Sequence, residues 1–251
     1  MDTSLFSSED QGDVAVVRFK PRKSLYTADS RAMFDAWEAF EQIQVQAKRV
    51  VVFRMPQGYL SPTLVDDFWQ RAMEAPVGHT PRGGPPRPQM VAAADISMKR
   101  SLTFLKSLPA LTIVACEGEI DFDLLGLLLA CKYRMCSANT TFVNRTLRRN
   151  VGPGSATPWF LARSLGFAKT RRLYLDEVTL SADESLELGI VDRVCDADSL
   201  EQDALSVAEH FSQFDGVALN SLMRGMQLVD LDLATYLEQA GTGFQRLPRS
   251  S

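Results

Sequence analysis

The chain has 251 residues, 45% of them hydrophobic and 23% charged, which is enough for a globular protein with a substantial core. Its 27 basic and 31 acidic residues leave a net charge of −4, which argues against nucleic acid as the main partner. The longest apolar run, 124–131, is far shorter than the roughly 20 residues of a membrane helix. The acidic N-terminus lacks the apolar core of a secretory signal. We therefore expect a cytoplasmic protein with no membrane segment.

The first half of the chain alternates between strand-like and helix-like patterns. Apolar runs typical of buried strands occupy 14–19, 50–53 and 111–116. Apolar residues recur at helical spacing over 32–43, 64–73 and 98–108. The segment 78–88, GHTPRGGPPRP, contains too many helix breakers for regular structure and is predicted to be a surface loop. This β-α-β order favours a parallel sheet covered by helices.

The second half continues the same alternation in shorter units. The patterns predict a helix at 124–131, a strand at 133–136 and helices at 157–165 and 182–188. The α/β class follows from the whole series of elements.

Cysteine and histidine patterns give no sign of a metal or redox site. The four cysteines are Cys116, Cys131, Cys136 and Cys195, and they lack C-x-x-C and zinc-ribbon spacing. We expect reduced thiols in the core. The two histidines, His79 and His210, are too few for a His-rich metal site, and His210 lies in a helical pattern. No metal is predicted.

Three segments carry a family resemblance. The first is ACEGEIDFDLLGLLLACKYRMCSANTTF, in which Gly118, Arg134 and Phe142 stand at characteristic spacings. The others are VGPGSATPWFLARSLG and LSADESLELGIVDRV. In residues 115–194 the chain resembles the crotonase superfamily, also called the enoyl-CoA hydratase/isomerase family.

This resemblance implies an α/β crotonase fold, which is a repeated β-β-α spiral with surrounding helices. The expected core covers residues 1–195, and the C-terminal helical region, 196–251, is shorter than is usual for the family. The resemblance also implies a homo-oligomer, either a trimer or a hexamer. A CoA thioester is the expected ligand, and no other cofactor is implied.

In the family, two backbone N–H groups form an oxyanion hole that stabilises the enolate-like charge on the thioester oxygen. The equivalent positions here are Ser61 and Asp123. Phe122-Asp123-Leu124 replaces the family's three-glycine turn, which lets a ligand approach the backbone. An ionised Asp123 would also repel the developing negative charge. For Asp121 and Asp123 we expect a structural role, capping the following helix.

Both catalytic glutamates of the family's hydratases are missing. Their positions correspond to Gly126 and Thr146, and neither residue can exchange a proton with water at neutral pH. We therefore do not expect water addition by the usual route.

Two functions remain open at this stage. The first is a pseudoenzyme, an accessory crotonase-fold subunit that supports an active partner enzyme. The alternative is an enzyme of unusual chemistry on an acyl thioester borne by CoA or an acyl carrier protein, such as an isomerase, dehydratase or decarboxylase of polyketide-type biosynthesis. Its candidate acid or base is Asp123 or Asp121 with a raised pKa, assisted by Asn144 and Thr146.

Basic residues are the candidate contacts for a ligand phosphate or carboxylate. They are Lys23, Arg145, Arg148 and Arg149. A solvated surface is the more frequent location for clustered arginines, and we expect it for these three.

Overall fold

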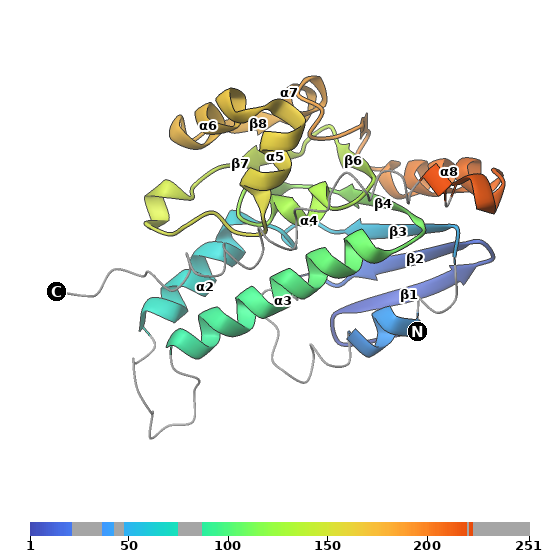
Figure 1. Ribbon diagram of the computed structural model, residues 1–251, viewed down its shortest axis with the longest axis horizontal. Helices are drawn as coiled ribbons and strands as arrows, with labels where there is room; N and C mark the ends of the chain where they lie inside the picture. The colour runs from blue at the N-terminus through green and yellow to red at the C-terminus, as the bar shows by residue number, and fades with distance from the viewer. Residues whose placement is uncertain (22–36, 43–47, 75–86, 220, 223–251) are drawn as a thin grey trace.

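A computed structural model describes residues 1–21, 37–42, 48–74, 87–219 and 221–222. A six-stranded sheet with the order β1-β2-β3-β4-β6-β9 runs through the molecule (Figure 1). Its strands are β1 (Phe6–Gln11), β2 (Val14–Phe19), β3 (Val50–Met55), β4 (Leu111–Cys116), β6 (Tyr133–Ser137) and β9 (Arg193–Cys195). β1 pairs antiparallel with β2, and the described pairs from β2 to β9 are parallel, as predicted.

Both faces of the central strands β2, β3 and β4 are buried, which explains their nearly continuous apolar runs. Val50 and Val52 face a cluster that includes Ala204 of helix α8 (Leu200–Ser212). Val51 and Phe53 point the other way, into the larger core. The alternation of side chains along a strand thus divides one apolar run between two cores.

A smaller sheet lies beside the large one. Its three strands are β5 (Glu119–Asp121), β7 (Thr141–Val143) and β8 (Thr179–Ser181). Two successive units, β4-β5-α4 and β6-β7-α5, each place their first strand in the large sheet and their second in the small one. This arrangement is the repeated β-β-α spiral implied by the resemblance.

The remaining helices pack around these sheets. They are α2 (Pro62–Glu74), α3 (Arg87–Ser107), α4 (Leu125–Leu129), α5 (Thr157–Leu165), α6 (Phe167–Leu175) and α7 (Ala182–Glu187), with a 3₁₀ turn η1 (Leu147–Arg149). The bounds of α5 agree with the predicted ones. α3 begins earlier than predicted, so Arg87 and Pro88 belong to it and not to the predicted loop; proline is tolerated in a first helical turn. Residues 78–86 of that loop lie outside the described residues.

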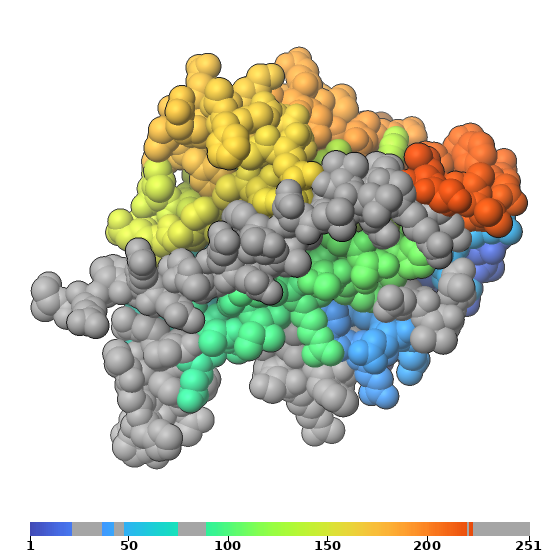
Figure 2. All heavy atoms as spheres, in the orientation of Figure 1, coloured from blue at the N-terminus to red at the C-terminus, as the bar shows by residue number. Residues whose placement is uncertain are grey.

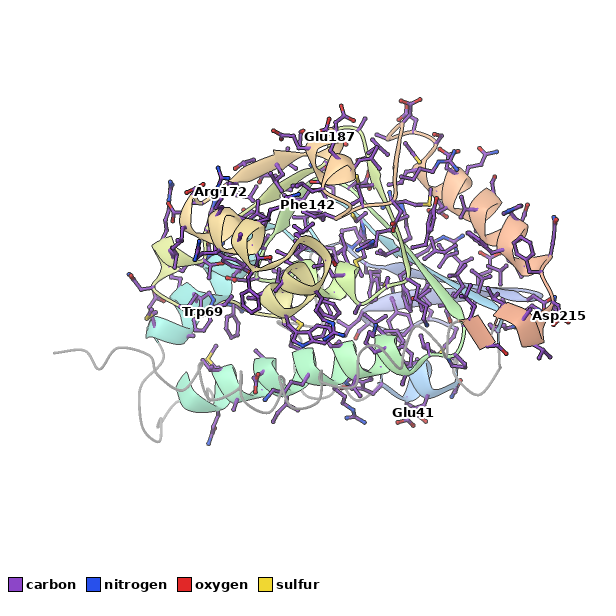
Figure 3. All side chains as sticks on the ribbon, turned by 45° about the horizontal axis from the view of Figure 1, so that its top comes forward. Glu41, Trp69, Phe142, Arg172, Glu187 and Asp215 are labelled. Atoms are coloured by element: carbon purple, nitrogen blue, oxygen red, sulfur yellow. The ribbon has the colours of Figure 1, made fainter. Side chains whose placement is uncertain are left out.

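The predicted helix over 32–43 is described only at 37–42, which are helical. All four cysteines are free and buried, as expected. Figure 3 shows the labelled Phe142 among the packed side chains of the interior, whereas Glu187 and Asp215 lie at the periphery. The boundary at residue 195 stays a prediction, and α8, which follows it, packs on the large sheet. None of the helices in the described ranges is long and apolar enough to cross a bilayer.

Candidate functional site

The two segments expected to supply the oxyanion donors are neighbours in the fold. The N–H of Asp121 donates to the carbonyl of Leu60 at 2.8 Å, which joins the start of α2 to the turn before α4. At the head of α2, the Ser61 hydroxyl oxygen accepts a hydrogen bond from the N–H of Leu64 at 3.3 Å. Ser61 therefore caps α2, and Pro62 occupies its first turn.

The N–H of Asp123 is already hydrogen-bonded inside the protein. It donates to Oδ1 of Asp121 at 2.8 Å. Asp121 is completely buried and Asp123 is 4% exposed, so water cannot easily take the place of that carboxylate. The donor at the expected oxyanion position is thus occupied by an acidic side chain two residues earlier.

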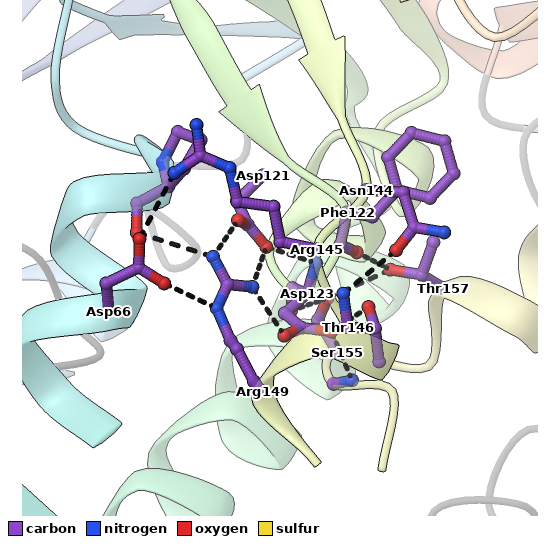
Figure 4. Close-up of polar contacts among 12 residues, drawn as sticks. Asp66, Asp121, Phe122, Asp123, Asn144, Arg145, Thr146, Arg149, Ser155 and Thr157 are labelled. Atoms are coloured by element: carbon purple, nitrogen blue, oxygen red, sulfur yellow. Dashed lines mark hydrogen bonds and ion pairs between the residues drawn. The ribbon is translucent and has the colours of Figure 1, made fainter. Parts of the chain in front are cut away.

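Arg149 forms ion pairs with both aspartates (Figure 4). Its Nη2 lies 2.6 Å from Oδ2 of Asp121, and its Nη1 lies 3.1 Å from Oδ2 of Asp123. Its Nε lies 2.6 Å from Oδ1 of Asp66 on α2. The Arg149 side chain is only 7% exposed. One guanidinium therefore links η1, α2 and the turn before α4.

The expectation of solvated arginines is wrong for Arg149, because three carboxylates surround its guanidinium and two of them are buried. It is confirmed for Arg148, whose side chain is 72% exposed. Arg145 is 42% exposed and lies 3.2 Å from Asp66. Lys23 lies outside the described residues.

Burial of the two aspartates changes their titration. Loss of water, followed by the charge of Asp121, raises the pKa of Asp123 to about 6, against the lowering effects of Thr146 and Arg149. Burial likewise raises the pKa of Asp121, with Arg149 acting against the change. A raised pKa was the expectation for buried neighbouring carboxylates, and the structure agrees with it.

Thr146, at the position predicted for the second family glutamate, is bonded to Asp123. Its hydroxyl donates to Oδ1 of Asp123 at 2.8 Å, and the same oxygen accepts from the N–H of Gly154 at 3.3 Å. Asn144 supports this segment, because its side chain accepts from the N–H of Thr146 at 3.1 Å and donates to the carbonyl of Leu173 at 3.0 Å. Both oxygens of Asp123 are therefore engaged within the protein.

Gly126, at the position predicted for the first family glutamate, has no space for a side chain. A Cβ built there would lie 1.6 Å from the backbone oxygen of Ser155. The N–H of Gly126 donates to Oγ1 of Thr157 at 2.9 Å and lies 3.2 Å from Oγ of Ser155. The loop before α5 thus fills the volume that a glutamate would need.

That loop adopts an unusual backbone conformation. Ser155 and Ala156 have φ values of 44° and 54°, in the left-handed region that costs a non-glycine residue about 1–2 kcal/mol. The Ser155 hydroxyl donates to the carbonyl of Asp123 at 2.6 Å, and the Thr157 hydroxyl donates to that of Phe122 at 2.8 Å. These bonds offset the strain. The left-handed conformation of Ser155 and Ala156 was not predicted from the sequence, since neither serine nor alanine favours positive φ.

The predicted capping role of Asp121 and Asp123 is wrong. Leu124 is the N-cap of α4, its side chain makes no capping hydrogen bond, and the first turn has no acidic residue. Both carboxylates instead form ion pairs with Arg149.

No metal site competes with this interpretation in the described part of the chain. Its histidine, cysteine, aspartate and glutamate residues form no group of three suited to an ion. His210 is an exposed residue of α8 beside Phe211 and Phe214, as its helical pattern predicted, and His79 lies outside the described residues.

The sequence profile of a family described as enoyl-CoA hydratase/isomerase matches residues 89–249, well over half of the chain. This protein belongs to the enoyl-CoA hydratase/isomerase family. The family member also shares its fold with the enoyl-CoA hydratase from Bacillus halodurans, at a TM-score of 0.77 and 15% identity, over 96% of this chain and 94% of that one. The crotonase fold is therefore established.

Curated relatives match shorter stretches of this family member. The trans-2-decenoyl-[acyl-carrier-protein] isomerase of Streptococcus mutans is 26% identical over 113 residues, 45% of this chain and 43% of the relative. The short-chain-enoyl-CoA hydratase of Clostridium acetobutylicum is 27% identical over 119 residues, 46% of this chain and 45% of the relative. The matched stretch thus covers less than half the length of each of these two relatives.

Proposed function

We propose that this family member is a non-catalytic accessory subunit that supports an active partner enzyme. The observation that carries the proposal is the 2.8 Å hydrogen bond from the N–H of Asp123 to the Asp121 carboxylate. An oxyanion hole stabilises charge only if its donors are aimed at the reacting oxygen. Here a thioester oxygen would have to displace a carboxylate that Arg149 also holds.

Charge works against the usual chemistry as well. Two buried carboxylates, Asp121 and Asp123, lie in the turn that we propose to be equivalent to the family's oxyanion turn. In a site of low dielectric constant their repulsion of a new negative charge is larger than in water. Arg149 offsets part of this charge, but its guanidinium is already bound to the same carboxylates.

The two residues at the predicted glutamate positions, Gly126 and Thr146, also lack a side chain that could transfer a proton. Gly126 has no side chain and no room for one. The Thr146 hydroxyl does not ionise at neutral pH and is bonded to Asp123. These two residues therefore fit a structural role better than the catalytic role of a hydratase.

A turnover assay is the first test. The purified chain is incubated with trans-2-enoyl thioesters of CoA and of an acyl carrier protein, with the Clostridium acetobutylicum hydratase as the positive control. We expect no turnover above buffer. Turnover that Asp123→Asn abolishes would overturn the proposal, because it would make Asp123 the acid or base of an enzyme.

Ligand binding is the second test. A ligand at about 100 times its Kd stabilises a folded protein by about 2.7 kcal/mol, so thermal unfolding with CoA and a panel of acyl-CoAs detects an open pocket. We expect no selective shift. A selective shift would contradict the closed site.

The accessory role itself is tested on the partner. The tagged chain is isolated from its native cells together with any bound enzyme, and that enzyme is assayed with and without this chain. We expect the partner's activity to fall when the chain is removed. A partner whose rate is the same in both preparations would contradict the role.

A further inference from the structure

Basic residues of the chain are concentrated in one stretch. Residues 124–175 contain nine lysines and arginines and no aspartate or glutamate, although the whole chain has a net charge of −4. Some of these cations are used within the protein: Arg149 binds three aspartates, and Arg134 lies 2.9 Å from Asp192. The stretch ends in α6, and the atoms of α5 and α6 form the yellow upper rim of the molecule in Figure 2.

Helix α6 presents an exposed apolar and basic surface. Its members, here called the α6 face, are Phe167, Arg171, Arg172 and Leu175, and the exposed Lys169 lies farther around the same helix. Phe167 is 85% exposed and Leu175 is 63% exposed. Arg171 is exposed and lies one turn from each, at the i+4 spacing that places the three in one row. Figure 3 shows Arg172 on the outer part of the same helix.

This composition is typical of a protein interface. Aromatic residues and arginine are enriched in interface cores, and an apolar row flanked by cations favours an acidic partner. Among the residues that the structure describes, Lys169, Arg171 and Arg172 form no ion pair. Their charges are therefore available to carboxylates of another molecule.

A second copy of this chain is the weaker candidate for that molecule. Acidic residues follow directly after the basic stretch, but several of them are paired within the same chain. These pairs are Glu177 with Arg148, Asp192 with Arg134, Glu201 with Arg18 and Asp203 with Arg193. Docking these carboxylates on a second α6 face would break ion pairs that already exist.

We propose that the α6 face docks an acyl carrier protein through acidic residues of the carrier. The inference rests on the proposed function, because an accessory subunit acts through protein contacts and not through a thioester pocket. Charge complementarity with Lys169, Arg171 and Arg172 supports it. A relative of this chain is named for a substrate on an acyl carrier protein, which motivates the choice of carrier.

Calorimetric titration of the full chain with a purified holo acyl carrier protein tests the docking. Arg171→Glu is compared with Arg71→Glu, an equally large change of charge at an exposed position of α2. We expect Arg171→Glu to weaken binding at least about tenfold and Arg71→Glu to change it by less than about twofold. Raising the salt from about 0.05 M to about 0.5 M should also weaken binding. Phe167→Ser should weaken it at both salt concentrations, because its contact is apolar.

Three results would overturn the docking proposal. The first is the absence of carrier binding by the unmodified chain, and the second is an equal loss of binding in the two arginine variants. The third is a lower oligomeric mass of Arg171→Glu in light scattering, which would assign the face to a second copy.

Circular dichroism checks folding, and Arg171→Gln provides a milder variant. The turnover assay runs on the same preparations. Binding together with turnover supports docking and overturns the accessory role, whereas the absence of both overturns docking alone.

Discussion

Arg149 and Asp121 form a two-point ion pair in the protein interior. Nη2 of the arginine lies 2.6 Å from Oδ2 of the aspartate, and Nη1 lies 3.1 Å from Oδ1. Planar pairing of this kind fixes both partners more strictly than a single contact. Oδ1 also accepts the N–H of Asp123, so one carboxylate binds both the guanidinium and the backbone turn before α4.

Removal of the Arg149 charge should strongly destabilise the fold. Arg149→Met leaves Asp121 and Asp123 buried without their cation, and loss of one partner of a buried pair costs about 3–5 kcal/mol. Urea denaturation measures the change in the free energy of unfolding. Arg148→Met is the matched control, since Arg148 is 72% exposed and an exposed pair contributes less than about 1 kcal/mol. Equal losses in both variants would show that Arg149 does not hold the site together.

Stability should depend on pH through Asp123. Its pKa is about 6 in the folded protein and 3.8 ordinarily, so between these values the folded state binds more protons than the unfolded state. The contribution of this group to stability is fully present below the lower value and is lost as pH rises through about 6. Asp123→Asn cannot ionise, so the stability of the variant relative to the wild type should rise between about pH 4 and about pH 7.

Urea denaturation of both proteins across this pH range gives the comparison. Because only the difference between the two curves is used, titrating groups that do not interact with Asp123 cancel, and the difference reports Asp123 together with its neighbour Asp121. Parallel curves would mean that Asp123 keeps its ordinary pKa in the fold.

The closed space at Gly126 predicts a steric effect. Gly126→Ala places a methyl group 1.6 Å from the Ser155 oxygen, so the loop before α5 must move. Overpacking of this kind costs about 1–3 kcal/mol or more. Gly152→Ala, in the same loop region, has nothing within 4 Å of the added Cβ and should change stability by less than about 0.5 kcal/mol. Thermal unfolding of the two variants distinguishes them, and an unaffected Gly126→Ala would show that the loop yields easily.

Four buried thiols should be unreactive in the native state. Burial raises the pKa of Cys131 and of Cys136 to about 12, and the thiolate is the reactive form. A thiol reagent such as Ellman's reagent should therefore label none of the four cysteines before denaturation and all four after it. Rapid labelling of the native protein would indicate an opening of the sheet at β4, β6 or β9.

The sequence by itself determined which chemical groups are present at the predicted site. It also determined the positions of the longer strands and helices. Gly126 and Thr146 have no carboxyl group in any fold, so the prediction that they cannot replace glutamates follows from residue types alone. Strand β4 and helix α5 were predicted with their observed bounds, because their apolar periodicity is long enough to stand out. Strands β5 and β7 have three residues each and were missed, since so short a segment shows no periodicity.

Only the tertiary structure decided which of the arginines is buried. Arg145, Arg148 and Arg149 lie within five residues and look alike in the sequence, yet only Arg149 has its side chain in contact with two buried carboxylates. Burial of a charge depends on partners that lie 26 and 28 residues away along the chain and on α2 still further away. Asp121 was expected to cap a helix, but its side chain instead binds Arg149 and accepts the N–H of Asp123. Local propensity contains no term for so distant a partner.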